Sequence, residues 1–246
     1  MNWNTIQIGG GYLIRHEHGL RLLTTNARRE RYADAQIDDY RRLSRRHFPW
    51  RAPLRMSLRA RASGPITGTA GFGFWNNPLT PIGGVPALPA AIWFFHASPP
   101  SHLPLAQGGP ASGWMCMTID ATTPRALRWA PLAPLVLLAN RLPGVQRRLW
   151  PLVQRDLRIT MVPVAAPTYL WHTYTLEWQA MCARFWVDDA LVFETPTSPR
   201  SPLGFVAWVD NQCAVATPRG RLGWELLDAP GLQWLDIDQL QIEPQS

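Results

Sequence analysis

Two aspartates and one histidine are the residues of this chain best suited to acid–base chemistry. Asp38 belongs to an alternating segment, Asp210 ends an aromatic segment, and His96 follows the aromatic run that begins at Trp93. Carboxyl and imidazole groups exchange protons with a substrate near neutral pH when burial or a neighbouring charge tunes their pKa. Asp38, Asp210 and His96 are therefore the candidate catalytic residues. Each also has a plainer interpretation, as an arginine-paired surface carboxylate, a loop cap and a hydrogen-bonded structural histidine respectively.

Tryptophan is the second residue type of this chain that is suited to a functional site. Thirteen Trp in 246 residues exceed what a hydrophobic core requires, although core packing accounts for half or more of them. An excess of indole rings suits a concave face that stacks on sugar rings or holds a flat apolar ligand. Together with nearby polar residues they form the candidate ligand-binding set, which comprises Gln36, Tyr40, Trp75, Asn76, Trp93, Trp208 and Asn211.

Alternating segments must position these side chains. In residues 32–40, Ala33, Ala35 and Ile37 share one face of a strand, and the period of two places Asp34, Gln36, Asp38 and Tyr40 on the other face. Two alternatives are open for this polar row. It is either a solvated outer face, which we favour, or one wall of a cleft.

A hairpin is predicted over residues 172–193. Residues 172–178 and 183–187 alternate apolar and polar side chains, and Asp188-Asp189 turns the chain into a further apolar run. One face of this ribbon is apolar and must lie on a second layer. With some ten to twelve short strands in the chain and no internal repeat, the pattern favours a two-sheet antiparallel β-sandwich.

The hairpin also resembles that of concanavalin A-like sandwiches, above all glycoside hydrolase family 16 and laminin G-like domains. Three stretches carry the resemblance: Leu58-Arg-Ala-Arg61, Ala91-Ile-Trp-Phe-Phe95 and His172 to Trp178. The resemblance covers roughly residues 54–242 and implies an all-β jelly-roll fold.

One departure from family 16 bears on activity. The family's hydrolases carry E-x-D-x-E or E-x-D-x-x-E on one strand, which supplies the nucleophile and the general acid. The corresponding stretch here, residues 114–120, reads Trp-Met-Cys-Met-Thr-Ile-Asp, and no glutamate occurs between Glu30 and Glu177. We therefore expect no retaining glucanase activity.

Residues 125–158 change from strand to helical spacing. Val145, Leu149, Leu152, Val153 and Leu157 recur at helical intervals beside four arginines, and four prolines divide the segment into short pieces. We interpret it as a helical insertion within one domain that covers residues 1–246. Three placements are open, in order of preference: a cover on the convex sheet, a lid over the cleft, or a membrane-surface contact.

The composition indicates which binding partners and which cellular compartment to expect. All 24 basic residues are arginine, spread along the chain among carboxylates, so the net charge of +7 does not indicate a nucleic-acid site. Three cysteines lack CxxC or His/Cys spacing, which favours free thiols, no metal and no disulfide. With no secretory signal and no run of 18 uncharged apolar residues, we expect a cytoplasmic protein without an ordinary transmembrane helix.

Three functions remain open. The first is binding of a carbohydrate or a comparable hydrophobic small molecule, without a cofactor. The second is an enzyme on the same scaffold that uses Asp/His acid–base chemistry. The third is a structural or interaction domain whose aromatic residues all lie in the core.

Overall fold

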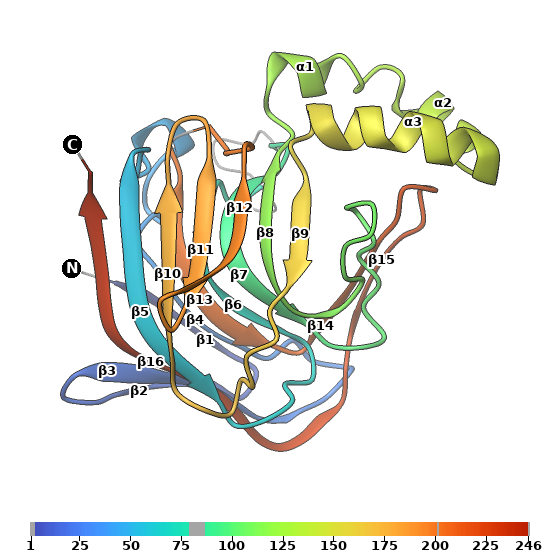
Figure 1. Ribbon diagram of the computed structural model, residues 1–246. Helices are drawn as coiled ribbons and strands as arrows, with labels where there is room; N and C mark the ends of the chain where they lie inside the picture. Colours follow the sequence, from blue (N-terminus) through green and yellow to red (C-terminus); the bar gives the residue numbers. More distant parts are fainter. Residues whose placement is uncertain (1–2, 79–86, 201, 246) are drawn as a thin grey trace.

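The protein is a two-sheet β-sandwich, as predicted. The computed structural model describes residues 3–78, 87–200 and 202–245, and in it two seven-stranded antiparallel sheets pack face to face (Figure 1). Sheet 1 consists, in spatial order, of β1 (Asn4–Ile8), β4 (Asp34–Asp38), β13 (Gly204–Asp210), β6 (Thr69–Trp75), β7 (Ala90–Ala97), β8 (Gly113–Asp120) and β9 (Thr160–Pro163). Sheet 2 consists of β12 (Ala190–Thr195), β11 (Ala183–Val187), β10 (His172–Trp178), β5 (Leu54–Ala62), β16 (Ala229–Pro244), β3 (Gly19–Ala27) and β2 (Gly11–Arg15).

The core between the sheets follows from period-two alternation. Strand β6 sends Phe72 and Phe74 inward, and β10 sends Tyr174 and Trp178 toward them from sheet 2. The Phe72 and Tyr174 ring centroids lie 5.2 Å apart, and those of Phe74 and Trp178 lie 5.8 Å apart. Such tilted and edge-on aromatic contacts join the two layers in addition to the area they bury.

The outer face of sheet 2 explains part of the arginine content. Arg55, Arg59 and Arg61 alternate along β5 with buried side chains, and each meets a carboxylate on a neighbouring strand. Arg61 Nε lies 3.1 Å from Asp236 Oδ2, and Arg55 Nη1 lies 3.4 Å from Glu177 Oε1. This arginine row is a charge-paired surface of the sandwich.

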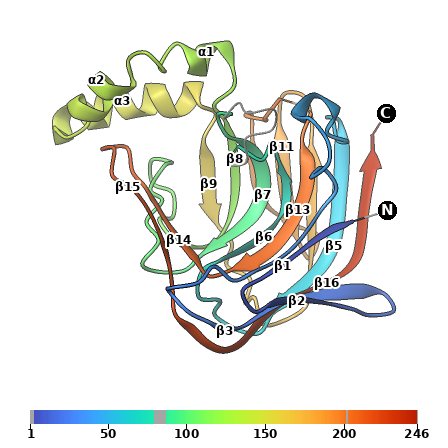
Figure 2. The same cartoon turned by 180° about the vertical axis from the view of Figure 1, so that it is seen from behind.

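Several elements lie outside the two sheets. They are the hairpin of β14 (Gln212–Ala216) and β15 (Leu222–Leu226), the 3-10 turn η1 (Arg45–His47), and the helices α1 (Pro124–Leu127), α2 (Ala133–Ala139) and α3 (Pro143–Asp156). No hairpin was predicted from the sequence at residues 212–226. The three helices lie between β8 and β9, where an insertion was predicted (Figure 2).

The insertion does not cover the convex sheet, which was the preferred expectation. Its buried residues Val136, Trp150 and Val153 belong to the same hydrophobic cluster as Met115 and Met117 of β8, which face away from sheet 2. The Trp150 indole N–H donates to the Leu105 carbonyl at 2.8 Å. The insertion therefore packs on the outer side of sheet 1, against the loop that precedes β8.

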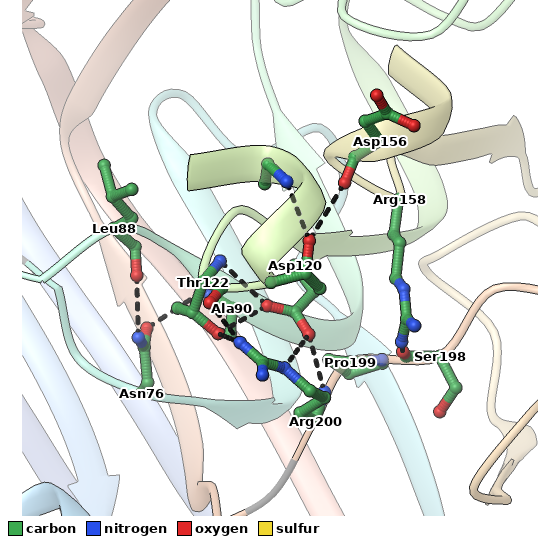
Figure 3. Close-up of polar contacts among 12 residues, drawn as sticks. Asn76, Leu88, Ala90, Asp120, Thr122, Asp156, Arg158, Ser198, Pro199 and Arg200 are labelled. Atoms are coloured by element: carbon green, nitrogen blue, oxygen red, sulfur yellow. Dashed lines mark hydrogen bonds and ion pairs between the residues drawn. The ribbon is translucent and has the colours of Figure 1, made fainter. Parts of the chain in front are cut away.

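Polar contacts anchor the base of the insertion (Figure 3). The Asp120 carboxylate is fully buried; its Oδ1 accepts from the Thr122 amide at 2.9 Å and its Oδ2 from the Arg200 amide at 2.9 Å. At the other end of the insertion, Arg158 Nη1 donates to the Ser198 carbonyl at 2.6 Å. The segment that precedes β13 is thus tied to both ends of the insertion.

Candidate functional site: the concave face of sheet 1

The outer face of sheet 1 carries a cleft of about 480 Å³. Strands β1, β4, β13, β6, β7 and β14 contribute to its lining, and none of the lining residues comes from β8 or β9. The polar row of residues 34–40 therefore faces this cleft, which was the less favoured of the two alternatives. The lining comprises Ile6, Ile8, Tyr32, Asp34, Gln36, Asp38, Tyr40, Arg41, Thr69, Trp75, Asn77, Trp93, Phe95, Val206, Trp208, Asp210, Gln212 and Ala214.

Three tryptophans from three adjacent strands form the aromatic part of the cleft. Trp93 lies at their centre: its ring centroid is 5.4 Å from that of Trp208 and 5.8 Å from that of Trp75. Trp75 and Trp93 are half-buried, whereas Trp208 is buried. Sugar-binding proteins use such partly exposed ring faces, because an indole offers apolar area with one N–H donor.

The glycines of β6 make room for these rings. Gly71 lies opposite Trp208 and Gly73 lies opposite Trp93 in the strand register. A Cβ atom at Gly71 would lie 2.8 Å from Trp208 Cη2, and one at Gly73 would lie 2.6 Å from Trp93 Cβ. The Gly-Phe-Gly-Phe alternation of β6 therefore accommodates the tryptophans on one face and fills the inter-sheet core on the other.

The indole N–H groups differ in one respect. Trp208 Nε1 donates to Thr69 Oγ1 at 2.9 Å, and Trp75 Nε1 donates to the Tyr40 hydroxyl. Trp93 Nε1 is buried and has no hydrogen-bond partner among the residues that the structure describes. A buried donor without a partner is uncommon and costs free energy, so Trp93 Nε1 would gain by an acceptor if ligand binding moved the ring or its neighbours enough to open the N–H to the cleft.

Asp34 and Asp210 form a carboxyl pair at one end of the cleft. They are register partners on β4 and β13, and both are buried. Asp210 Oδ1 accepts from the Thr69 amide at 3.1 Å, Thr69 Oγ1 at 2.8 Å and the Gln212 amide at 3.0 Å. Asp34 Oδ1, in contrast, is a buried oxygen without a partner among the described residues.

Burial raises the pKa of both carboxyl groups of this pair. Desolvation raises the pKa of Asp210 to about 6, against the lowering effect of its three donors. Desolvation and the neighbouring charge of Asp210 raise the pKa of Asp34 well above its ordinary value, while the Tyr32 hydroxyl and Arg41 lower it. Burial therefore favours the protonated form of both carboxyls, and for Asp34 the charge of Asp210 acts in the same direction.

Asp38 lies in the same row but has a different role. It accepts from Asn4 Nδ2 at 2.9 Å, Gln36 Nε2 at 3.1 Å and the Arg41 amide at 2.9 Å. These contacts cap the turn after β4 and fix the orientation of Gln36, which itself lines the cleft. Asp38 is thus part of the cleft wall, with its oxygens occupied by the protein itself.

Three predicted site residues do not line this cleft. His96 lies on the opposite face of β7 from Trp93 and Phe95, where its Nε2 and the Ile66 carbonyl are 3.0 Å apart. Burial lowers the pKa of His96, as expected for a structural histidine. Asn76 links the Leu88 carbonyl to the Ala90 amide (Figure 3), and Asn211 binds three carbonyls and the Ala33 amide.

Several cleft residues were not among the predicted set. Asp34 shares the alternation of Gln36 and Asp38, so its place on the face was predictable even though it was not selected. Phe95 is likewise two residues beyond Trp93 on β7. Tyr32 and Thr69 gave no signal in the sequence, because their roles depend on contact with Asp210 across the sheet.

The strand that carries the acid motif in family 16 is apolar here. On β8, Met115, Met117 and Ile119 alternate on the face turned away from sheet 2, and all three are buried. They belong to the cluster that contains Trp150 and Val153 of the insertion. This part of the concave face is therefore packed with side chains instead of being open to a substrate.

The raised pKa values of the buried carboxyls predict that the protein becomes less stable as pH rises through their titration range. The pKa of Asp39 is also raised, to about 6, by desolvation. Because the folded state holds more protons than the unfolded state between about pH 4 and pH 6, the free energy of unfolding should fall as pH rises through this window. Each pKa shift of about two units corresponds to a change of about 2–3 kcal/mol in the free energy of unfolding. Burial of His96 acts in the opposite direction below its ordinary pKa.

Urea unfolding of the wild type and an Asp210→Asn variant at about pH 5 and about pH 7.5 checks this prediction. The comparison cancels the contribution of His96. The wild type should lose more stability than the variant as pH rises, and an equal loss in both proteins would contradict the assignment.

Comparison with known proteins identifies the fold. No protein-family profile matches the chain, and no curated protein sequence matches it. A prokaryotic beta-1,3-1,4-glucanase (lichenase) from a mouse hindgut metagenome superposes with a TM-score of 0.53 at 10% identity, covering 99% of this chain and 93% of that chain. The Crh5 transglycosylase in complex with NAG gives 0.52 at 13% identity, covering 99% and 79%.

A glycoside hydrolase family protein from Mycobacterium thermorestibile gives a TM-score of 0.50 at 14% identity, covering 98% of this chain and 92% of that chain. The fold is therefore the concanavalin A-like jelly-roll sandwich that these glucanase and transglycosylase structures share. At these identities the similarity establishes the fold and leaves the activity to be argued from the site.

Proposed function

We propose that this protein binds a short carbohydrate in the cleft of sheet 1. The observation that carries the proposal is the cluster of Trp75, Trp93 and Trp208 on one concave face, in a fold shared with carbohydrate-active proteins. The inter-sheet core does not account for these rings, since they line the opposite face of sheet 1, where they pack with the second hydrophobic cluster and leave Trp75 and Trp93 partly exposed. A cleft of about 480 Å³ is also within the usual size range of small-molecule sites.

Two buried polar atoms specify what the ligand must offer. Among the residues that the structure describes, Trp93 Nε1 has no acceptor and Asp34 Oδ1 has no partner. Once ligand binding opens these atoms to the cleft, a ligand with hydroxyl groups satisfies both, because a hydroxyl accepts from an indole N–H and exchanges a hydrogen bond with a carboxyl group. A purely hydrophobic ligand would leave both atoms unsatisfied, which favours the carbohydrate over the apolar molecule.

The packing of β8 favours a short ligand over a long chain. Residues of β8 and of the insertion fill the concave side next to the cleft, so the cleft does not continue across all seven strands. An oligosaccharide of a few units suits this enclosure better than a polysaccharide that runs through an open groove.

A calorimetric titration with a panel of mono-, di- and trisaccharides tests the proposal. At least one sugar should bind with heat that disappears in a Trp93→Ala variant and persists in a Trp186→Ala variant. Trp186 is a matched control, because it is half-buried on β11 of sheet 2. Binding by none of the sugars, or equal binding by both variants, would refute the proposal.

The purified protein should not hydrolyse laminarin or lichenan. Met115, Met117 and Ile119 occupy the face of β8 where the family 16 residues would lie, and none has a carboxyl group. A reducing-sugar assay measures this directly. If turnover occurs and substitution of a single carboxylate abolishes it, another pair of carboxyl groups carries out the retaining mechanism.

One observation favours a second candidate function, acid–base catalysis in the same cleft. Asp34 and Asp210 combine a raised pKa with a place in the cleft wall, which is typical of catalytic carboxyl pairs. If a sugar from the panel is converted, Asp34→Asn should abolish turnover while its affinity changes little. An Asp189→Asn variant in the exposed β11–β12 turn is the control.

A further inference from the structure

The helical insertion carries most of the net charge of the protein. Residues 124–158 contain seven arginines and one aspartate, a net charge of +6 compared with +7 for the whole chain. Their only acid, Asp156, is buried and bound to Arg155 and to the Trp129 indole. Arg125, Arg141, Arg147 and Arg148 are exposed and form no ion pair within the part of the chain that the structure describes.

The same segment exposes an unusual number of large apolar side chains. Of the 19 large hydrophobic residues exposed among the described residues, seven lie between positions 127 and 152. Leu135, Leu138 and Leu142 are each about 60% exposed. Because exposed apolar area of this extent is costly in water, such a surface marks a contact site.

Helix α3 arranges these residues as an amphipathic surface. Trp150 and Val153 face the protein, while Leu142, Val145, Leu149 and Leu152 line a shallow groove together with Arg147 and Arg148. Spacings of three and four residues place the four apolar residues on one stripe of the helix. We call these six residues the α3 surface. The helices extend beyond the sheets at the edge of the molecule (Figures 1 and 2), so a flat partner can reach them.

We propose that the α3 surface docks the protein on an anionic lipid bilayer. Leucine side chains enter the interface between head groups and acyl chains, and the flanking guanidinium groups bind the lipid phosphates and carboxylates. A second copy of the chain is a poorer partner, because it would place +6 opposite +6. Among the described residues, no helix is long and apolar enough to cross a membrane, so the contact lies on the bilayer surface.

Co-sedimentation with vesicles tests this proposal. Vesicles of phosphatidylcholine with about 30% phosphatidylserine should bind the wild-type protein, and vesicles of phosphatidylcholine alone should not. Binding should weaken at high salt, since the arginines act through screened charge. A Leu142→Gln/Leu152→Gln variant should lose at least about tenfold in binding, and Arg147→Gln/Arg148→Gln should lose roughly fivefold for each arginine.

Matched substitutions elsewhere distinguish docking through the α3 surface from non-specific adsorption to vesicles. Leu170→Gln/Leu191→Gln removes two leucines of similar exposure, and Arg15→Gln/Arg42→Gln removes two exposed arginines. Both control variants should bind like the wild type. Equal binding to neutral vesicles, unchanged binding of the α3-surface variants, or no vesicle binding at all would overturn the proposal. A dimer that Leu142→Gln/Leu152→Gln converts to a monomer would identify a second copy as the partner instead.

Discussion

A Trp93→Ala variant is expected to bind the carbohydrate at least about tenfold more weakly than the wild type, a loss of about 1.4 kcal/mol or more. Trp93 is the central ring of the aromatic cluster and the one whose buried N–H has no partner among the described residues. The substitution removes both a stacking surface and a hydrogen-bond donor. Calorimetry on the sugar selected from the panel measures the loss.

A Trp93→Phe variant separates the two contributions. It keeps an aromatic face against Trp208 and Phe95 but removes the N–H group. Affinity between that of the wild type and that of Trp93→Ala would support both roles. Wild-type affinity in Trp93→Ala, with an unchanged free energy of unfolding, would contradict the position of the site.

An Asp120→Ala variant should lower the free energy of unfolding by about 3–5 kcal/mol. The carboxylate is fully buried and accepts from the amides of Thr122 and Arg200 and from Thr122 Oγ1 at 2.6 Å. Removing it leaves those donors without an acceptor at the base of the insertion. Urea unfolding measures the change, with an Asp189→Asn control in the exposed turn, because Asn tolerates the left-handed backbone of Asp189.

The carbohydrate affinity of the Asp120→Ala protein gives a second result. If the insertion helps to enclose the cleft, loosening its base should weaken binding as well as stability. A loss of less than about 1 kcal/mol in the free energy of unfolding would show that the donors find other partners.

The fold was predictable because half-buried strands leave a period-two pattern. Strands β5 and β10 have such a pattern, and the pairing of β10 with β11 and the turn at Asp188-Asp189 agree with the prediction. The β14–β15 hairpin was missed because β15 lies in solvent along most of its length, so no face of it had to be apolar. The face on which the insertion packs was mispredicted because its helices have apolar residues on more than one side.

The candidate site was only partly predictable for a related reason. Alternation assigns Gln36, Asp38 and Tyr40 to one face, but it does not show whether that face is concave. The parity of β7 already separates His96 from Trp93, and its neglect led to the wrong assignment of His96. The pairing of Asp34 with Asp210 joins residues 176 positions apart and requires the strand order of the sheet.

The most direct test of carbohydrate binding in this cleft is the indole N–H signal of Trp93. In protein labelled with ¹⁵N-tryptophan, the signal is assigned by its absence in Trp93→Phe and followed during titration with the sugar that binds. The Trp93 signal should shift most, with smaller shifts for Trp75 and Trp208 and none for Trp186. A stationary Trp93 signal while the sugar is bound would place the binding site elsewhere and contradict the account.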